Sequence, residues 1–370
     1  MIFLNSMHLE RKESKMKKKF KCLIATFLVI SLTFINATSV GAIDVVGENV
    51  YSYTPENYLE YDYINQTYCT IPIDSVFDYA STTTTTYELA GMTSELPRLE
   101  AMNQMYDSSV LPVSVVDPSK YFMNTAPQTI DGPQPPFSGV VLILTGYDKN
   151  GDGIKEWSRG TGFMVAPDVM VTAAHNVVKY DANDQFLNTE VRVYPFYDAG
   201  SLHPLNTNVD YIYPARWRCY EYEPALKKND YDTGDLDVLD YDWCVMKLQE
   251  SIENAYNFAC STAITTISNS RIAVSGYPKC VLMSCGNTTD CKHQETFGQY
   301  STYGTATAIT PYRIEFNNNT KGGMSGGPVY DVYTTICYAI NSYEYNDCSG
   351  NGATIITPNI YNAIADYINL

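Results

Sequence analysis

Residues 319–330 read NTKGGMSGGPVY, so Ser325 lies in a segment with two glycines before Met324 and two after the serine. Glycine allows positive φ angles and lets backbone N–H groups come close to a ligand, which suits both a tight turn and an oxyanion hole. A serine hydroxyl is a poor nucleophile near neutral pH unless a base accepts its proton. The motif therefore fits a catalytic serine or an ordinary glycine-rich turn, and the histidines decide between them.

The chain has four histidines, and all of them precede Ser325: His8, His175, His203 and His293. GMSGG also fits the nucleophile elbow of α/β-hydrolases, but there the catalytic histidine follows the serine. That esterase reading is therefore excluded. The order histidine, aspartate, serine remains open.

His175 has the sequence context expected of a catalytic base. Residues 160–178, GTGFMVAPDVMVTAAHNVV, read as two apolar strands joined by a Pro-Asp turn, with His175 after small residues at the end of the second strand. His203 lies before Pro204 in a polar stretch and His293 lies in a cysteine-rich loop, so neither follows a strand. We predict that His175 is the base.

A carboxylate should orient that histidine. Residues 230–248, DYDTGDLDVLDYDWCVMKL, contain six aspartates, and most of such a run is typical of a solvated loop. Asp242 differs because it opens the apolar strand WCVMKL. Asp240, two residues earlier on the same face of an extended chain, is the alternative.

TAAHNV, DWCVMKL and GGMSGGPVY occur in this order, and with them the chain from about residue 137 to its end resembles a chymotrypsin-fold serine protease, especially the bacterial glutamyl endopeptidases. The resemblance implies an all-β fold of two six-stranded antiparallel β-barrels, with a C-terminal α-helix docked on the second barrel. It implies a triad of His175, Asp242 and Ser325, with the N–H groups of Gly323 and Ser325 as the oxyanion hole.

Two positions depart from the animal enzymes of this family. Met324 replaces the aspartate that pairs with a new N-terminal amine on activation, and Ala174 replaces a cysteine before the histidine. In glutamyl endopeptidases a threonine and a histidine bind the P1 carboxylate, and Thr320 and Asn341 align with them. Because an amide brings no positive charge, we expect Glu at P1 with Gln or Asn also accepted.

The N-terminal part indicates export and processing. Residues 16–42 combine a basic start, an apolar run and a small-residue end at Ala42, which is typical of a secretory signal peptide. We therefore assign 1–42 to an extension and signal peptide, 43–127 to a propeptide, and 128–370 to the protease domain. The tyrosine-rich and acidic segment 43–127 also fits a disordered linker. We expect a mature N-terminus between Val115 and Gln128.

The charge balance disfavours a nucleic-acid partner. The net charge is −17, and residues 128–370 hold 15 Lys and Arg against 27 Asp and Glu. No segment beyond the signal is apolar enough to cross a membrane. We expect a secreted, extracellular monomer whose partners are protein or peptide substrates and its own propeptide. The alternative function is a catalytically inactive barrel that binds peptides or a surface.

Export permits disulfide bonds, and Cys337 and Cys348 flank one loop and could pair. Cys244 lies in a core strand and is predicted to be a buried free thiol. A zinc site of Cys285, Cys291 and His293 is conceivable, but its spacing lacks the paired pattern of structural zinc. No cofactor is expected.

Residues 147–157, YDKNGDGIKEW, begin like a calcium loop with Asp148, Asn150 and Asp152 as candidate ligands. The twelfth position is Arg159, where such a loop needs a glutamate, so a polar hairpin tip is preferred. At the C-terminus, Thr357 and Pro358 predict the start of a helix. One apolar face of this helix is formed by Ile360, Ile364 and Tyr367.

Overall fold

The computed structural model describes residues 55–76, 88–89, 128–129, 135–180, 187–197, 203–206, 209–221, 240–264, 271–279, 297–344 and 350–370. All of them belong to one unit, Ile43–Leu370. Several predicted features lie outside these residues: the signal peptide, the sites of processing at 115–127, and His8, Cys285, Cys291, His293 and Cys348.

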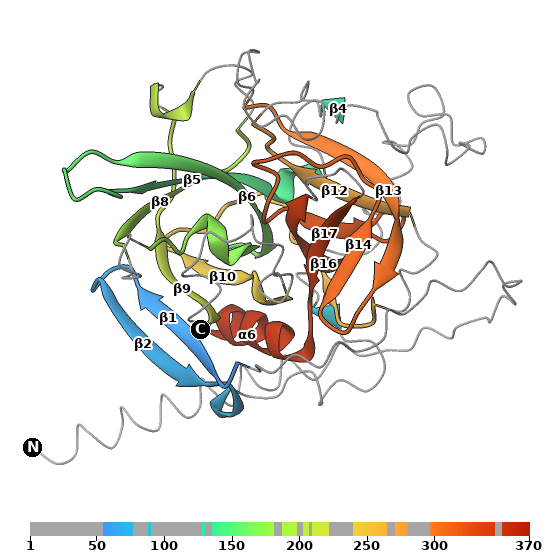
Figure 1. The fold of residues 1–370 in the computed structure, drawn as a ribbon, viewed down its shortest axis with the longest axis horizontal. Coiled ribbons are helices and arrows are strands. Elements are labelled where there is room, and N and C mark those ends of the chain that lie inside the picture. Colours follow the sequence, from blue (N-terminus) through green and yellow to red (C-terminus); the bar gives the residue numbers. More distant parts are fainter. Residues whose placement is uncertain are drawn as a thin grey trace, which may run out of the picture. The chain divides into compact units, whose positions relative to one another are not determined.

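Two sheets make up the domain (Figure 1), and their strand pairings are antiparallel apart from one short parallel pairing in the second sheet. Six strands of the first sheet run in the order β9-β10-β7-β6-β5-β8. Val193 of β8 forms an isolated bridge with Ile212, which lies two residues before β9. The six strands are β5 (Val140–Tyr147), β6 (Glu156–Ala166), β7 (Val169–Thr172), β8 (Thr189–Tyr194), β9 (Pro214–Tyr220) and β10 (Cys244–Leu248).

The second sheet forms a closed ring of six strands, β15-β12-β13-β14-β17-β16, because β15 also pairs with β16. The expectation of two full barrels is therefore met only in part, since continuous strand pairing closes one barrel. The ring strands are β12 (Arg271–Gly276), β13 (Tyr300–Ile309), β14 (Arg313–Phe316), β15 (Pro328–Asp331), β16 (Cys337–Glu344) and β17 (Asn351–Ile355).

Three short strands join the second sheet: β3 (Glu88–Leu89), β4 (Gln128–Thr129) and β11 (Cys260–Ser261). A hairpin of β1 (Asn57–Asp62) and β2 (Thr67–Pro72) extends the first sheet beyond β9. Single 3₁₀ turns lie at Ile73–Ser75, Phe137–Gly139, Ala174–Asn176 and Pro204–Asn206.

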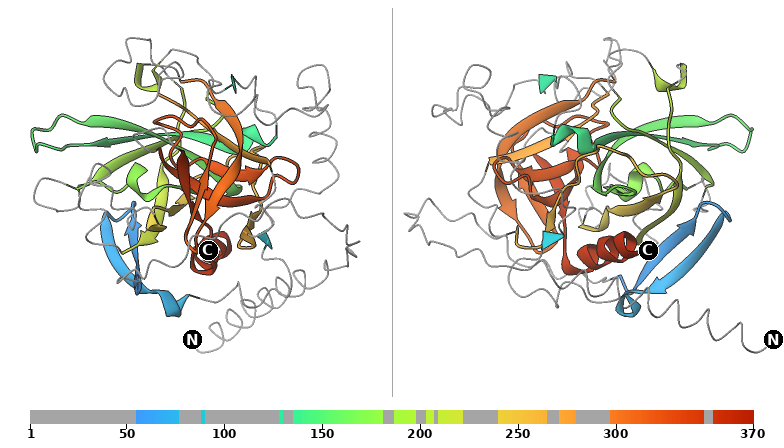
Figure 2. Two further views of the ribbon diagram at one scale, coloured as in Figure 1. Left: turned by 45° about the vertical axis from the view of Figure 1, so that its right-hand side comes forward. Right: turned by 180° about the vertical axis from the view of Figure 1, so that it is seen from behind.

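The C-terminal helix α6 (Pro358–Asn369) begins as predicted, with the Thr357 hydroxyl accepting from the N–H of Ile360. The predicted apolar face is confirmed, because Ile360, Ile364 and Tyr367 are fully buried. The docking surface was predicted wrongly. The helix packs against β6, β7 and β10 of the first sheet, and Figure 2 shows it beside the β1–β2 hairpin in both views.

The apolar runs of the sequence form the expected core. Strands β5 and β7 are almost wholly buried, and one core cluster joins side chains from both sheets and from α6. The polar tip predicted at residues 147–157 joins β5 to β6, and the two apolar strands predicted within residues 160–178 are β6 and β7. Among the described residues no helix is long and apolar enough to span a membrane.

The hairpin tip uses its acidic side chains to hold the turn. Asp148 accepts from the N–H groups of Asp152 and Gly153, and Asp152 accepts from that of Ile154. Gly151 and Gly153 both have positive φ. This is the polar hairpin tip preferred from the sequence. Over the described part of the chain, no group of three or more His, Cys, Asp or Glu side chains could hold a metal ion.

All five described cysteines are free thiols: Cys69, Cys219, Cys244, Cys260 and Cys337. Cys244 is buried, as predicted. Cys337 is buried as well, and its thiol donates to the carbonyl of Ala339. Its suggested partner Cys348 lies outside the described residues.

Candidate active site

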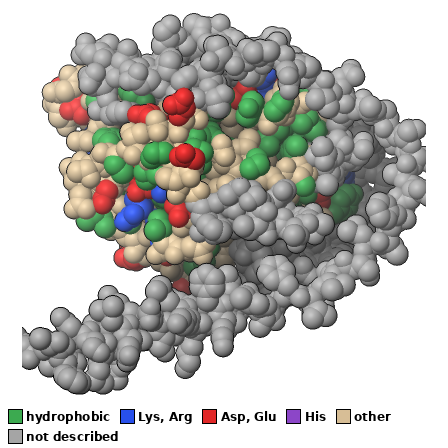
Figure 3. Space-filling view, turned by 90° about the horizontal axis from the view of Figure 1, so that it is seen from below, with side chains coloured by type: hydrophobic (Ala, Val, Ile, Leu, Met, Phe, Trp, Pro, Cys, Tyr) green, Lys and Arg blue, Asp and Glu red, His purple; other side chains and the backbone are tan. Residues whose placement is uncertain are grey.

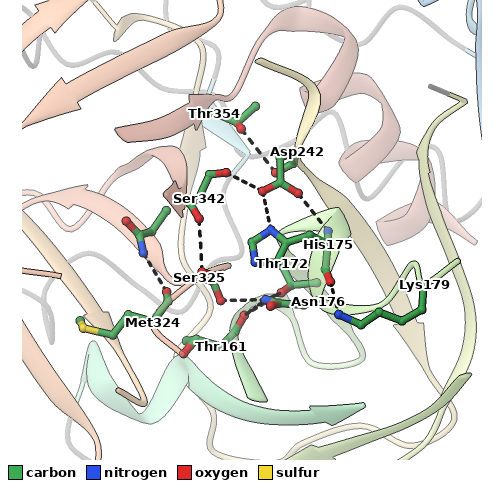
Figure 4. A network of polar contacts seen from close by, with 11 residues as sticks. Thr161, Thr172, His175, Asn176, Lys179, Asp242, Met324, Ser325, Ser342 and Thr354 are labelled. Atoms are coloured by element: carbon green, nitrogen blue, oxygen red, sulfur yellow. Dashed lines mark hydrogen bonds and ion pairs between the residues drawn. The ribbon is translucent and has the colours of Figure 1, made fainter. Parts of the chain in front are cut away.

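His175 and Asp242 meet between the two sheets (Figure 4). The carboxylate of Asp242 accepts twice from His175. Its Oδ1 accepts from the backbone N–H at 2.9 Å, and its Oδ2 lies 2.6 Å from the ring Nδ1. The His175 side chain is 26% exposed and that of Asp242 only 1%. The pairing fixes the ring orientation, with Nδ1 turned toward the carboxylate and Nε2 on the other side of the ring.

Local structure explains how these two side chains are placed. Strand β7 ends at Thr172, and fully buried Ala173 and Ala174 lead into the 3₁₀ turn that carries His175. Asp242 comes two residues before β10, which pairs with β7 in register Cys244↔Thr172. Because β7 and β10 are neighbouring strands, His175 after β7 and Asp242 before β10 lie at the same end of these two strands.

Two further groups hold Asp242, one at its carboxylate and one at its backbone. The hydroxyl of Ser342 donates to Oδ2 at 2.5 Å, and the hydroxyl of Thr354 donates to the Asp242 backbone carbonyl at 3.4 Å. Burial alone raises the pKa of this carboxyl, but the charge of His175 and the hydrogen bonds from His175 and Ser342 outweigh it, so the pKa lies below its ordinary value. The acid stays ionised beside the imidazole.

Asp240 does not reach the histidine. Its carboxylate is buried and lies 3.4 Å from the guanidinium of Arg313 on β14. The alternative acid thus forms an ion pair within the domain. His203 is also placed elsewhere, since its Nδ1 accepts from the N–H of Leu205 and its ring packs on Phe297 at 4.6 Å.

Ser325 lies in the glycine-rich turn before β15, and the first sheet holds its backbone. The carbonyl of Ser325 accepts from the N–H of Thr161 at 2.8 Å and from Asn176 Nδ2 at 2.7 Å. The Ser325 hydroxyl donates to the carbonyl of Ser342 at 3.2 Å. Ser342 thus contacts both Ser325 and Asp242, and Figure 4 shows all these groups in one network.

Two glycines of the turn have conformations that L side chains rarely adopt. Gly323 has φ +98° and Gly326 has φ +85°. A Cβ on Gly323 would lie 2.6 Å from the carbonyl oxygen of Tyr277, and one on Gly326 would lie 2.1 Å from that of Thr161. Among the hydrogen bonds of the described residues, none uses the N–H of Gly323 or of Ser325. The turn can therefore offer two backbone donors to an oxyanion.

The candidate specificity residues flank this turn and are both buried. The Thr320 hydroxyl donates to Asn351 Oδ1 at 2.6 Å. Asn341 Nδ2 donates to the carbonyl of Met324 at 3.0 Å, while Asn341 Oδ1 is buried without a partner among the described residues.

Sequence reasoning missed Asn176, Ser342 and Lys179. Asn176 donates from Nδ2 to Thr172 at 2.9 Å as well as to Ser325, and the Lys179 ammonium donates to the His175 carbonyl at 2.6 Å. The sequence around Ser342 contains no motif that indicates a role in the site. Asn176 and Lys179 were detectable only as polar residues next to and one turn after the predicted base.

The chain is similar in sequence to known trypsin-like peptidases. Residues 160–337 match the model of the trypsin-like peptidase domain. The chain is similar to a glutamyl endopeptidase of Bacillus licheniformis, with 24% identity over 221 residues that cover 56% of this chain and 59% of the relative. The match thus spans less than two thirds of that relative.

Two solved structures are also similar. One is a Glu endopeptidase in complex with MPD (TM-score 0.44, 18% identity, 67% of this chain and 97% of that one). The other is a thermostable serine protease from an extremophilic microorganism (TM-score 0.39, 19% identity, 63% and 96%). Residues 160–337 thus match a trypsin-like peptidase domain, and the three ordered motifs agree with a chymotrypsin-like serine protease.

Proposed function

We propose that the protein is a serine endopeptidase that hydrolyses peptide bonds through an acyl-enzyme. The observation that carries the proposal is the double contact of Asp242 with His175, in the same group of side chains as Ser325 (Figure 4). In the first step the Ser325 hydroxyl leaves the Ser342 carbonyl and attacks the substrate carbonyl carbon. His175 takes the hydroxyl proton and then gives it to the leaving amine.

The remaining groups stabilise the charges that develop during the reaction. Asp242 stabilises the imidazolium, and the N–H groups of Gly323 and Ser325 donate to the oxyanion. Water then attacks the acyl-enzyme with His175 again acting as base. The proposal thus assigns catalysis to His175, Asp242 and Ser325. It also places the enzyme outside the cell, after removal of the signal peptide.

For the P1 side chain we propose Glu, with Gln or Asn also accepted. Support comes from Thr320 and Asn341, whose positions match the acid-binding pair of glutamyl endopeptidases. Neither carries a positive charge. The Thr320 hydroxyl and one of the two N–H groups of Asn341 Nδ2 already donate to other residues. Asn341 Oδ1 can accept a hydrogen bond from a P1 amide, whereas a carboxylate has no hydrogen to donate to it.

A peptide panel that differs only at P1 tests this proposal, with Glu, Gln, Asn, Lys and Phe compared by kcat/KM. We expect cleavage after Glu and Gln, and Asn341→His should increase the preference for Glu over Gln. Cleavage mainly after Lys or Phe would overturn the assignment of Thr320 and Asn341 and leave the triad standing. Complete absence of cleavage in folded protein would favour a peptide-binding barrel.

A further inference from the structure

The β1–β2 hairpin, residues 55–76, is built into the first sheet although it lies within the predicted propeptide. Strand β1 pairs with β9 over its length, from Tyr58↔Tyr220 to Asp62↔Arg216. Two flanking hydrogen bonds extend the pairing, from Tyr63 N–H to Ala215 and from Glu221 N–H to Asn57. The hairpin thus covers the edge of β9, which would otherwise expose unpaired backbone groups.

Side chains of β1 enter the core on both faces of the sheet. On one face Tyr58, which is fully buried, stacks on Tyr220 at 5.6 Å and meets Trp243 edge-on at 5.9 Å. On the other face Tyr61 packs against Trp217 at 5.5 Å between ring centres. Loss of the hairpin would expose these aromatic surfaces to water.

A buried ionic cluster ties the hairpin to β9 and to α6. Glu60 Oε2 accepts from Arg218 Nε at 3.0 Å, from Nη2 at 2.7 Å, and from the Tyr367 hydroxyl at 3.1 Å. Arg218 also donates to Asp366 at 2.7 Å. Arg218 is 4% exposed and Glu60 8% exposed. Removing one partner from a buried ion pair leaves the other charge uncompensated, which is strongly destabilising.

The same strands connect the hairpin to the candidate active site. The other edge of β9 pairs with β10 in register Arg218↔Val245 and Cys219↔Cys244. Strand β10 begins two residues after Asp242 along the chain. The hairpin therefore supports the strand pair that holds the acid in place.

We propose that the β9 edge and α6 form a docking site for residues 55–76 of this same chain, and that the hairpin stays bound after any cleavage between residues 77 and 128. Processing would then convert the protein into two chains in one folded particle. The inference goes beyond the proposed function, because it concerns the physical retention of a segment and does not require Ser325 to be reactive.

The test uses the full chain with Ser325→Ala, which prevents self-cleavage, and with the recognition site of a specific viral protease placed in the threonine run 82–86. After complete cutting, native size-exclusion chromatography at micromolar concentration and intact mass spectrometry show whether the fragments separate. We expect both fragments in one peak and their separation in 6 M guanidinium, a concentration chosen to unfold the domain. Release of the N-terminal fragment under native conditions overturns the proposal, whether or not the remainder stays folded.

A pair of substitutions in the cut protein tests the ionic cluster. Glu60→Gln keeps the size of the side chain and removes its charge, so we expect a lower melting temperature and release of the hairpin fragment on dilution. Glu56→Gln makes the same change at an exposed position of the same segment and should behave like the parent. Equal retention of the N-terminal fragment in the two variants would show that the ionic cluster does not hold the hairpin. Retention of this fragment in the parent protein tests the docking itself.

Discussion

At the scale of single residues, the structure separates two aspartates that the sequence leaves as alternatives. Asp242 contacts His175, whereas Asp240 pairs with Arg313. We therefore expect Asp242→Asn to lower kcat by about 10⁴, because the imidazole loses its orienting acid. Asp240→Asn should change kcat little and lower the melting temperature through Arg313. Steady-state kinetics and thermal unfolding of both variants check this, and the reverse pattern would assign the role to Asp240.

A second residue prediction concerns Lys179, which donates to the His175 carbonyl. Burial lowers the pKa of Lys179 from 10.5 to about 8, although the charge of Asp242 acts in the opposite direction. Between these two pKa values the unfolded chain binds more protons than the folded chain, so this group makes the free energy of unfolding rise with pH from about 8 to 10.5.

Urea unfolding of the wild type and of Lys179→Met between pH 7 and pH 10 measures that contribution, with the pH limits chosen to bracket the titration. We expect the stability difference to shift in favour of the wild type as pH rises, because the charged form of the half-buried lysine is the destabilising one. All other titrating groups cancel in the difference. A difference that does not change with pH would contradict the assigned titration.

At the scale of elements, the glycine-rich turn shows why the motif needs its glycines. A Cβ at Gly326 would lie 2.1 Å from the Thr161 carbonyl and 2.2 Å from the Thr172 hydroxyl, whereas one at Gly322 would meet nothing within 4 Å. We expect Gly326→Ala to reduce kcat/KM at least about 100-fold by moving Ser325 and to destabilise the domain by about 1–3 kcal/mol of backbone strain.

Gly322→Ala is the matched control and should stay close to the wild type in both kcat/KM and melting temperature. If Gly326→Ala hydrolyses peptides as fast as Gly322→Ala does, the turn is not held in the conformation described.

The elements also show what could be predicted from the sequence. The sequence predicts a triad of His175, Asp242 and Ser325 because each stands beside a recognisable apolar strand or a glycine-rich turn. Ser342 and Asn176 were not, since their roles depend on contacts between segments far apart in the chain. For the same reason the pairing of Glu60 with Arg218, 158 residues away, was missed, and α6 was assigned to the wrong sheet.

At the scale of the whole molecule, residues 128–370 hold 27 Asp and Glu against 15 Lys and Arg, so we expect charge to influence how substrates arrive. On the face shown in Figure 3, acidic side chains predominate over basic ones among the described residues. Such a field repels anions over about a Debye length, roughly 10 Å at 0.1 M salt. A peptide with acidic flanking residues should therefore be cleaved with a kcat/KM that rises as salt is added.

A peptide with the same P1 residue and neutral flanks is the control, and its kcat/KM should change little over the same range of ionic strength. Equal salt responses for the two peptides would show that the field does not influence association.

The central claim is that Ser325 is a nucleophile activated by His175, and reaction with a fluorophosphonate probe tests it most directly. Peptide mapping by mass spectrometry after labelling should find the probe on Ser325 of the wild type. Ser325→Ala should take up no label, and His175→Ala should label far more slowly while remaining folded by circular dichroism. Folded wild type that fails to react at Ser325, or His175→Ala that reacts at the wild-type rate, would contradict the account.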